Sequence, residues 1–437
     1  MSAATVPAGE FAGERAPAWR GGFGRLWTAA AVSRLGDGLR GAALPLLAVG
    51  LTDSPLLISL VTAAGFLPWL FFGLLGGAVA DRVDQRRAMW AVDAVRGALV
   101  AAFAVAVWLG VVGIALLLAL AFALTTLQTL FDNAATALLP SVVPADALGR
   151  ANARLMTGQT VAGTFLGAPL VPALLGLAAA VPFAVDAATY AAAAVLVASL
   201  RRPAPVRRPR TAGRTLRQDI AEGVRVLRRD RVLRALCAAN TIANTGVGAV
   251  IATLVLQVTG WLHAGRAGYV AVLVAYGVGS VAGGVLAGRW STLLGGRGRA
   301  LIPGLAVQAG CLVVLGTVRS LPVAVTVMAV FGALGMVWNV NETTLVQRRT
   351  PDALLGRVSA AMRTLAVAGA PLGAVAGGAA AGAWGFNAPP LLAAALFGCA
   401  LGALTPVVTT PDTGGESPAD PGSTSLDLQH GGRGEVD

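Results

Sequence analysis

Long apolar segments recur along the whole chain, separated by short polar, glycine or proline breaks. A helix needs about 20 apolar residues to cross about 30 Å of hydrocarbon. The predicted spans are residues 27–50, 56–79, 88–109, 113–134, 154–177, 181–200, 233–258, 267–287, 300–318, 321–342, 361–382 and 388–408. Because helices satisfy their own backbone hydrogen bonds inside lipid, the sequence predicts an all-α polytopic membrane protein with twelve transmembrane helices.

The composition is that of a chain that lies mostly within lipid. Hydrophobic residues make up 56% of the chain and charged residues 12%, whereas an ordinary soluble domain is about 25% charged. The 56 glycines favour helices that approach one another closely, because lipid supplies no hydrophobic drive for helix association. The cysteines are isolated and both histidines fall outside the predicted spans, so the sequence indicates no metal site and no cofactor.

The distribution of arginine predicts how the chain crosses the membrane. All 33 basic residues are arginines, and they are spread over loops rather than gathered on one soluble basic domain, which argues against a nucleic-acid partner. If the first polar segment is cytoplasmic, the inner loops hold arginines at 82, 86, 87, 150, 289, 297, 299, 348, 349 and 357, and the outer loops only at 266 and 319. The positive-inside rule then places both termini in the cytoplasm. Abundant Ala and Arg without Lys favour a bacterial cell membrane.

Two six-helix halves account for most of the chain. We expect a cytoplasmic tail (1–26), an N-terminal half (27–200), a cytoplasmic Arg-rich linker (201–232), a C-terminal half (233–408) and a disordered cytoplasmic tail (409–437). The linker contains an amphipathic stretch from Leu216 to Leu227, which predicts contact with anionic lipid headgroups.

One offset relates the two halves. A shift of 207 residues places Gly77–Arg82 on Gly284–Arg289, and the same shift places Pro144–Arg150 on Pro351–Arg357. It also places Asp37 on Asn244. Six-helix pseudo-repeats related by duplication are therefore predicted, with the substrate cavity near mid-membrane at their interface.

The loop between the second and third predicted spans, Gly77–Arg87, reads G-A-V-A-D-R-V-D-Q-R-R and resembles the G-x-x-x-D-R-x-x-R-R motif of the major facilitator superfamily. The resemblance implies the major facilitator fold, a secondary transporter, a monomer and a cytoplasmic gate. The gate residues it implies are Gly77, Asp81, Arg82, Arg86 and Arg87, with Arg150 and Arg357 in the later loops. The alternative is that these arginines only set topology.

Two further segments resemble the macrolide-efflux and siderophore-export branches of that superfamily. They are Leu138–Arg154, at the loop after span four, and Ser33–Asp37, in span one. The predicted span 113–134 holds no basic residue, unlike many drug antiporters of the superfamily.

Glycine and proline mark the fifth and eleventh predicted spans. Glycines four apart form a groove on one helix face and proline softens the backbone, which suits helices that pack closely and rock. The helix-packing residues are Gly163, Gly167 and Pro169, and Gly369, Pro371, Gly373 and Gly377. The fifth span resembles imperfectly the antiporter motif of drug exporters, so general packing and a specific antiport role both stay open.

Charges inside predicted spans indicate function because inserting each one costs several kcal/mol unless it faces a cavity or a partner. Arg34, Asp37 and Arg40 lie three apart on one face of the first span. Either Asp37 binds protons or substrate in a cavity, or the three residues fasten this helix to its neighbours. We interpret Asp93 and Arg96 as a structural pair and Asp186 as a charge at the membrane interface.

Acids near the inner ends of spans four and ten, Asp132 and Glu342, are further proton-coupling candidates, because desolvation disfavours the charged form of an acid. The alternative is that they are ordinary helix-end or gating charges. Besides Arg34 and Arg40, the candidates to line the substrate cavity are Gln128, Asn240, Asn244, Trp338 and Asn341.

The function that these features favour is proton-coupled efflux of an amphipathic drug or secondary metabolite by alternating access. An importer or facilitator of a small, possibly anionic, metabolite is the alternative. A membrane enzyme or sensor is not favoured, because the sequence offers no catalytic constellation. No G-x-x-x-x-G-K-[ST] loop is present, so ATP is not expected to drive transport.

Overall fold

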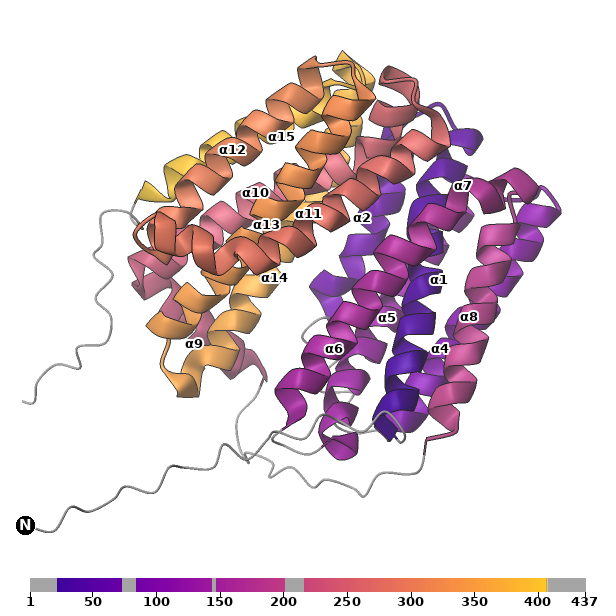
Figure 1. Cartoon of the computed structure of the whole chain (residues 1–437), viewed down its shortest axis with the longest axis horizontal. Helices are drawn as coiled ribbons and strands as arrows, with labels where there is room; N and C mark the ends of the chain where they lie inside the picture. The colour runs from indigo at the N-terminus through magenta and orange to yellow at the C-terminus, as the bar shows by residue number, and fades with distance from the viewer. Residues whose placement is uncertain (1–21, 73–83, 144–146, 201–215, 406, 408–437) are drawn as a thin grey trace, which may run out of the picture.

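The computed structural model describes residues 22–72, 84–143, 147–200, 216–405 and 407. Every regular element within these residues is helical. A first helix group comprises α1 (Gly22–Leu51), α2 (Pro55–Phe72), α4 (Gln85–Trp108), α5 (Ile114–Val142), α6 (Leu148–Thr160), the π-helix η2 (Val161–Gly167), α7 (Ala168–Leu177) and α8 (Val181–Ala198). A second helix group comprises α10 (Arg231–Leu256), the π-helix η3 (Gln257–Trp261), α11 (Gly265–Leu293), α12 (Arg297–Thr317), α13 (Leu321–Arg349), α14 (Asp352–Trp384) and α15 (Ala388–Ala403). The helix α9 (Leu216–Arg229) precedes α10, and Figure 1 shows the two groups side by side.

Nine helices in the described part of the chain are long and apolar enough to cross a membrane. This confirms a multi-pass helical membrane protein, while the count of twelve stays a prediction. The helices α2 and α15 are apolar but shorter. The first predicted span lies in α1, whose 30 residues include the charged side chains of Arg34, Asp37 and Arg40.

Packing within the two groups follows the same order of helices. In the first group, α1 packs against α8 and against the η2 and α7 segments, α4 against α8, and α2 against α5. In the second group, α10 packs against α15 and α14, α12 against α15, and α11 against α13. Each of these four packings in the first group therefore has a counterpart in the second.

Glycines bring the backbones of paired helices close together. A Cβ added at Gly167 would overlap the carbonyl oxygen of Leu35 in α1, and one added at Gly373 would overlap the carbonyl oxygen of Thr245 in α10. Gly163, Gly369 and Gly377 make similar approaches to the same two partner helices. Pro169 lies in the first turn of α7 and Pro371 lies inside α14.

The two groups touch each other through α2 and α14, α2 and α10, and α11 and the η2–α7 segment. Ala63 of α2, Ala252 of α10 and Ala374 of α14 form one buried cluster, and Gly378 of α14 lies against Ser59 of α2. These contacts lie toward the ends of α2 and α14 that are distant from α9. Figure 1 shows α6 and α9 apart from one another at the other end.

The amphipathic stretch predicted at Leu216–Leu227 is helical, within α9. Leu227 is buried in the main hydrophobic core, and a Cβ added at Gly223 would approach the carbonyl oxygen of Arg357 to 2.6 Å. Thus α9 packs against the start of α14. Asp230 then starts α10, since its side chain accepts from the backbone amides of the next turn.

Candidate functional site

Asp37, in the middle of α1, is the centre of a buried charge network. Its carboxylate lies 2.6 Å from Arg40, 2.8 Å from Arg96 of α4 and 3.4 Å from Arg34. Tyr190 of α8 donates its hydroxyl to the same carboxylate at 2.5 Å. Residues three apart on a helix share a face, so α1 presents Arg34 and Arg40 to Asp37, while α4 and α8 supply the other partners.

Two more aspartates belong to the buried part of this network. Arg96 lies 3.4 Å from Asp93, and Arg40 lies 3.2 Å from Asp186 of α8. The interpretation of Asp186 as an interfacial charge is wrong, because its side chain is fully buried and paired. Asp93 and Arg96 are likewise fully buried, as their reading as a structural pair requires.

One edge of the network is more accessible. Arg34 bonds Asp132 of α5 at 3.0 Å, and their side chains are 31% and 30% exposed. Gln128, one turn earlier on α5, also donates to Asp132 at 2.7 Å. This Arg34–Asp132 edge joins the first and fourth predicted spans.

A second polar cluster lies in the other helix group, around Glu342 of α13. Asn240 of α10 donates to both carboxylate oxygens at 2.8 and 2.9 Å, and Trp338 donates its indole N–H at 2.9 Å. Asn244 donates to Asn240 at 2.8 Å. Glu342 is 7% exposed, and among the described residues it forms no ion pair. Its partners are all neutral donors.

Asn341 and Arg40, two of the predicted cavity-lining residues, have polar groups bound to their own or neighbouring helices. Asn341 is fully buried and donates to the Val337 carbonyl of its own helix, so it is not part of the Glu342 cluster. Arg40 is occupied by Asp37 and Asp186. A lining role in the cavity is therefore not supported for either residue.

The predicted gate residues Gly77, Asp81 and Arg82 lie outside the described residues. Arg86 donates to the last carbonyls of α8, those of Val197 and Ala198, which belong to the same helix group. Arg87 is an exposed partner of Asp84. Arg150 lies half-buried in α6, and Arg357 bonds Glu222 of α9 at 2.7 Å.

Sequence reasoning missed Tyr190 and the pairing of Asp186. Both lie on α8, one turn apart, and the only local signal was a charged and a phenolic side chain on one face of an Ala-rich helix. The Arg96 guanidinium also lies 4.2 Å from the centre of the Tyr190 ring. Within the described residues no group of three His, Cys, Asp or Glu side chains could hold a metal.

Comparisons with known proteins agree with this arrangement of helices. The family model of the Major Facilitator Superfamily matches residues 26–374. An uncharacterized MFS-type transporter of Sinorhizobium fredii is 30% identical over 362 residues, covering 82% of this chain and 88% of the relative. The multidrug efflux pump Tap of Mycobacterium tuberculosis is 26% identical, with 86% of this chain and 89% of the pump covered. Macrolide efflux protein A of Streptococcus pyogenes is 25% identical over 51% of this chain and 55% of its own length.

Solved structures share the fold at low identity. A point mutant of the nucleoside transporter NupG superposes with a TM-score of 0.74 at 11% identity, covering 88% of this chain and 99% of the other. An inward-facing, occupied bacterial homologue of the human lysosomal transporter Spinster superposes with a TM-score of 0.71 at 12% identity, covering 91% and 98%.

Proposed function

The chain belongs to the major facilitator superfamily, and from this premise we propose that it is a proton-coupled exporter of an amphipathic drug or secondary metabolite. Transport, rather than catalysis, follows from the family and from the relatives. Two relatives are named as efflux proteins, which supports export over import. Alternating access is then the mechanism, with two six-helix halves that rock about the cavity between them.

The matching order of packing in the two helix groups supports the rest of this architecture. The proposed topology has twelve spans in two pseudo-repeats, a linker between the repeats, and both termini in the cytoplasm. It would place α9 and the arginine-rich loops on the inner side. The chain would act as a monomer, and the predicted gate around Asp81, Arg86 and Arg357 would close that side.

The observation that carries the coupling proposal is the environment of Glu342. Burying a carboxylate without a cation is costly, and binding a proton removes that cost. Asn240 and Trp338 are neutral donors, so they orient Glu342 without neutralising it. Glu342 is therefore the acid that best fits a proton carrier, exchanging its proton as access alternates.

Asp37 fits this role poorly. Three guanidinium groups and one hydroxyl surround it, so its charge is compensated throughout the cycle unless α1, α4 and α8 separate. Its contacts favour the alternative in which the triad fastens α1 to its neighbours. Asp132 fits the role of proton carrier better than Asp37 and less well than Glu342. Arg34 compensates the charge of Asp132, but both side chains are partly accessible.

The charges of the site favour a neutral or cationic substrate. Arg34, Arg40 and Arg96 face four aspartates, Asp37, Asp93, Asp132 and Asp186. None of these three arginines is left to bind an anion, so the importer of an anionic metabolite is the weaker alternative. Driving a proton through 100 mV releases about 2.3 kcal/mol, which is sufficient to accumulate substrate against a gradient.

Transport in proteoliposomes under an imposed pH gradient tests the proposal. With a panel of labelled amphipathic compounds, the unmodified protein should move at least one compound only when the gradient is present. Glu342→Gln keeps a side chain that accepts from Asn240 but cannot ionise, and it should abolish gradient-driven movement while leaving downhill exchange. Asp53→Asn, at an exposed acid, is the matched control. Gradient-driven transport by Glu342→Gln would refute the assignment of the proton carrier.

A further inference from the structure

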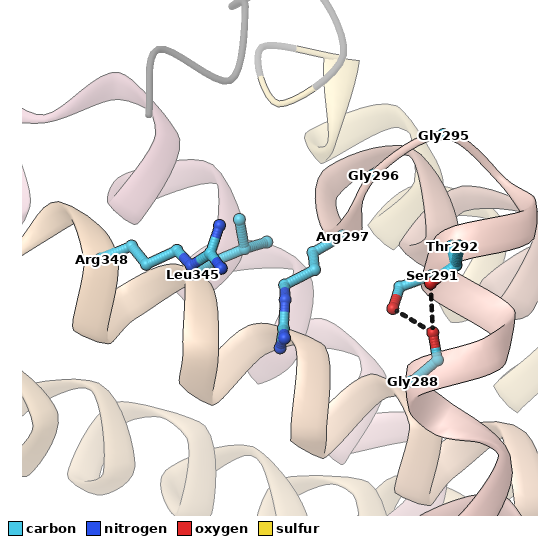
Figure 2. Close-up of a pocket in the computed structure, with 8 residues that line it drawn as sticks. All are labelled: Gly288, Ser291, Thr292, Gly295, Gly296, Arg297, Leu345 and Arg348. Carbon is cyan, nitrogen blue, oxygen red and sulfur yellow. Dashed lines mark hydrogen bonds between the residues drawn. The ribbon is translucent and has the colours of Figure 1, made fainter. Parts of the chain in front are cut away.

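A pocket of about 470 Å³ lies where α11, the following turn, α12 and α13 meet. Figure 2 shows its lining residues, among them Gly288, Ser291 and Thr292 of α11, Arg297 of α12, and Leu345 and Arg348 of α13. Among the described residues, no acidic side chain lines it. Neither Arg297 nor Arg348 has a hydrogen bond or ion pair within the described residues. Two guanidinium groups without partners therefore border one cavity.

The backbone adds to the positive character of this pocket. Gly296 precedes α12 and no side chain caps the helix, so the first amides of a 21-residue helix lack a side-chain acceptor at the pocket. Unpaired amides at a helix start and nearby arginines favour the same ligand, an anion with several acceptor oxygens. Phosphate has that chemistry.

The predicted internal repeat favours the same kind of ligand at this loop. The 207-residue shift that relates the two halves places Asp81 of the first loop on Gly288 of the second. The second copy therefore has glycine where the first has the acid, with Arg289 and Arg297 close by. A Cβ added at Gly288 would meet no atom within 4 Å, so this position opens onto unfilled space.

The surroundings favour a lipid as the source of the phosphate. Val285 and Thr292 are seven residues apart and share a face of α11, and Val285 is 77% exposed. Leu293, next to Thr292, is 82% exposed. In a membrane protein such exposed apolar side chains contact acyl chains. The indole of Trp290, which donates to the Ala300 carbonyl at 3.1 Å, is the side chain typical of the level of the headgroups.

We propose that this pocket binds the phosphate group of an anionic phospholipid whose acyl chains lie along the exposed face of α11. Arg297 and Arg348 bind the phosphate oxygens, and the amides at the start of α12 contribute further hydrogen bonds. The site lies outside the Glu342 cluster, and this inference does not depend on the direction or coupling of transport.

Native mass spectrometry of the delipidated full chain tests the proposal directly. Phosphatidylglycerol is titrated against phosphatidylcholine with the same acyl chains, and the unmodified protein should bind the anionic lipid preferentially. The double variant Arg297→Gln/Arg348→Gln should weaken that binding about thirtyfold. Gly288→Asp places an acid beside the arginines and should weaken the binding of the anionic lipid as well. Arg289→Gln, at an exposed neighbour that does not line the pocket, should have no such effect.

Three results would overturn the proposal. Equal binding of the two lipids by the unmodified protein would exclude selective recognition of an anionic headgroup. Unchanged binding of phosphatidylglycerol in both the double variant and Gly288→Asp would place the lipid elsewhere. Binding of inorganic phosphate without binding of phosphatidylglycerol would mean that the pocket serves a soluble anion. Because every readout is binding, failed transport in the Glu342 experiment leaves this test intact.

Discussion

The hydroxyl of Tyr190 in α8 donates to Asp37 in α1 at 2.5 Å. The oxygen that accepts it also accepts from Arg40 and from Arg96 of α4. Three helices of one group are therefore joined at a single carboxylate. This contact favours a structural role for the charges of α1, and it leaves the Glu342 cluster as the better candidate for coupling.

Replacing Asp37 should destabilise the protein. Asp37→Asn leaves Arg40 and Arg96 without their shared anion, and breaking a buried pair in this way costs about 3–5 kcal/mol. We expect a clear fall in the melting temperature of the purified protein, measured by thermal unfolding in detergent. Asp53→Asn should melt like the unmodified protein. A fully stable Asp37→Asn that had lost only gradient-driven transport would instead identify Asp37 as a proton carrier.

Replacing Asp132 should affect transport more than stability. The Arg34–Asp132 pair is partly exposed, so its contribution to stability is at most about 1 kcal/mol. If Asp132 attracts a cationic substrate, Asp132→Asn should raise the KM for cationic compounds several-fold and leave that for neutral compounds unchanged. Initial rates across the labelled panel measure the difference. An equal change for both classes would contradict the charge argument.

Close packing of α14 on α10 predicts a steep cost for one added methyl group. A Cβ at Gly373 would overlap the Thr245 carbonyl, whereas one at Gly382, on the same helix, meets nothing within 4 Å. Gly373→Ala should destabilise by about 1–3 kcal/mol, and Gly382→Ala should be neutral or slightly stabilising. Thermal unfolding of the two variants side by side checks this, and equal melting temperatures would refute it.

The ion pair between Glu222 of α9 and Arg357 of α14 predicts that α9 is held against the second helix group. Glu222→Ala should loosen it, because an accessible pair contributes up to about 1 kcal/mol, and amide exchange in α9 should rise by up to about fivefold. Hydrogen exchange read by mass spectrometry follows this segment. Arg225→Ala, at an exposed position of the same helix, should leave the exchange rate unchanged, and an equal rise in both variants would contradict the role of the pair.

Much of the helical architecture could be predicted because its signals are local. The preference of an apolar segment for lipid over water depends on its own length and composition, whatever its neighbours are. The i, i+3 spacing likewise placed Arg34, Asp37 and Arg40 on one face before any packing was known. The amphipathic character of the stretch Leu216–Leu227 in the linker could likewise be predicted from the local sequence alone.

The partners of these charges could not be predicted, because they depend on how each helix is rotated against the others. Asp186 looked like an interfacial charge in sequence, yet α8 turns it inward onto Arg40. Asn341 and Glu342 are adjacent in sequence, yet only Glu342 meets Asn240. Adjacent residues of a helix point about 100° apart, so the packing of α13 decides which of them enters the polar cluster.

The sequence by itself thus determined the solvent of the chain, its helices and the repeated motifs, because transfer from water to lipid acts on each segment separately. Only the tertiary structure decided that three arginines compensate Asp37 while neutral donors hold Glu342. The physical reason is that the energy of a buried charge is set by the groups within a few ångströms of it. Packing between helices distant in sequence brings those groups together.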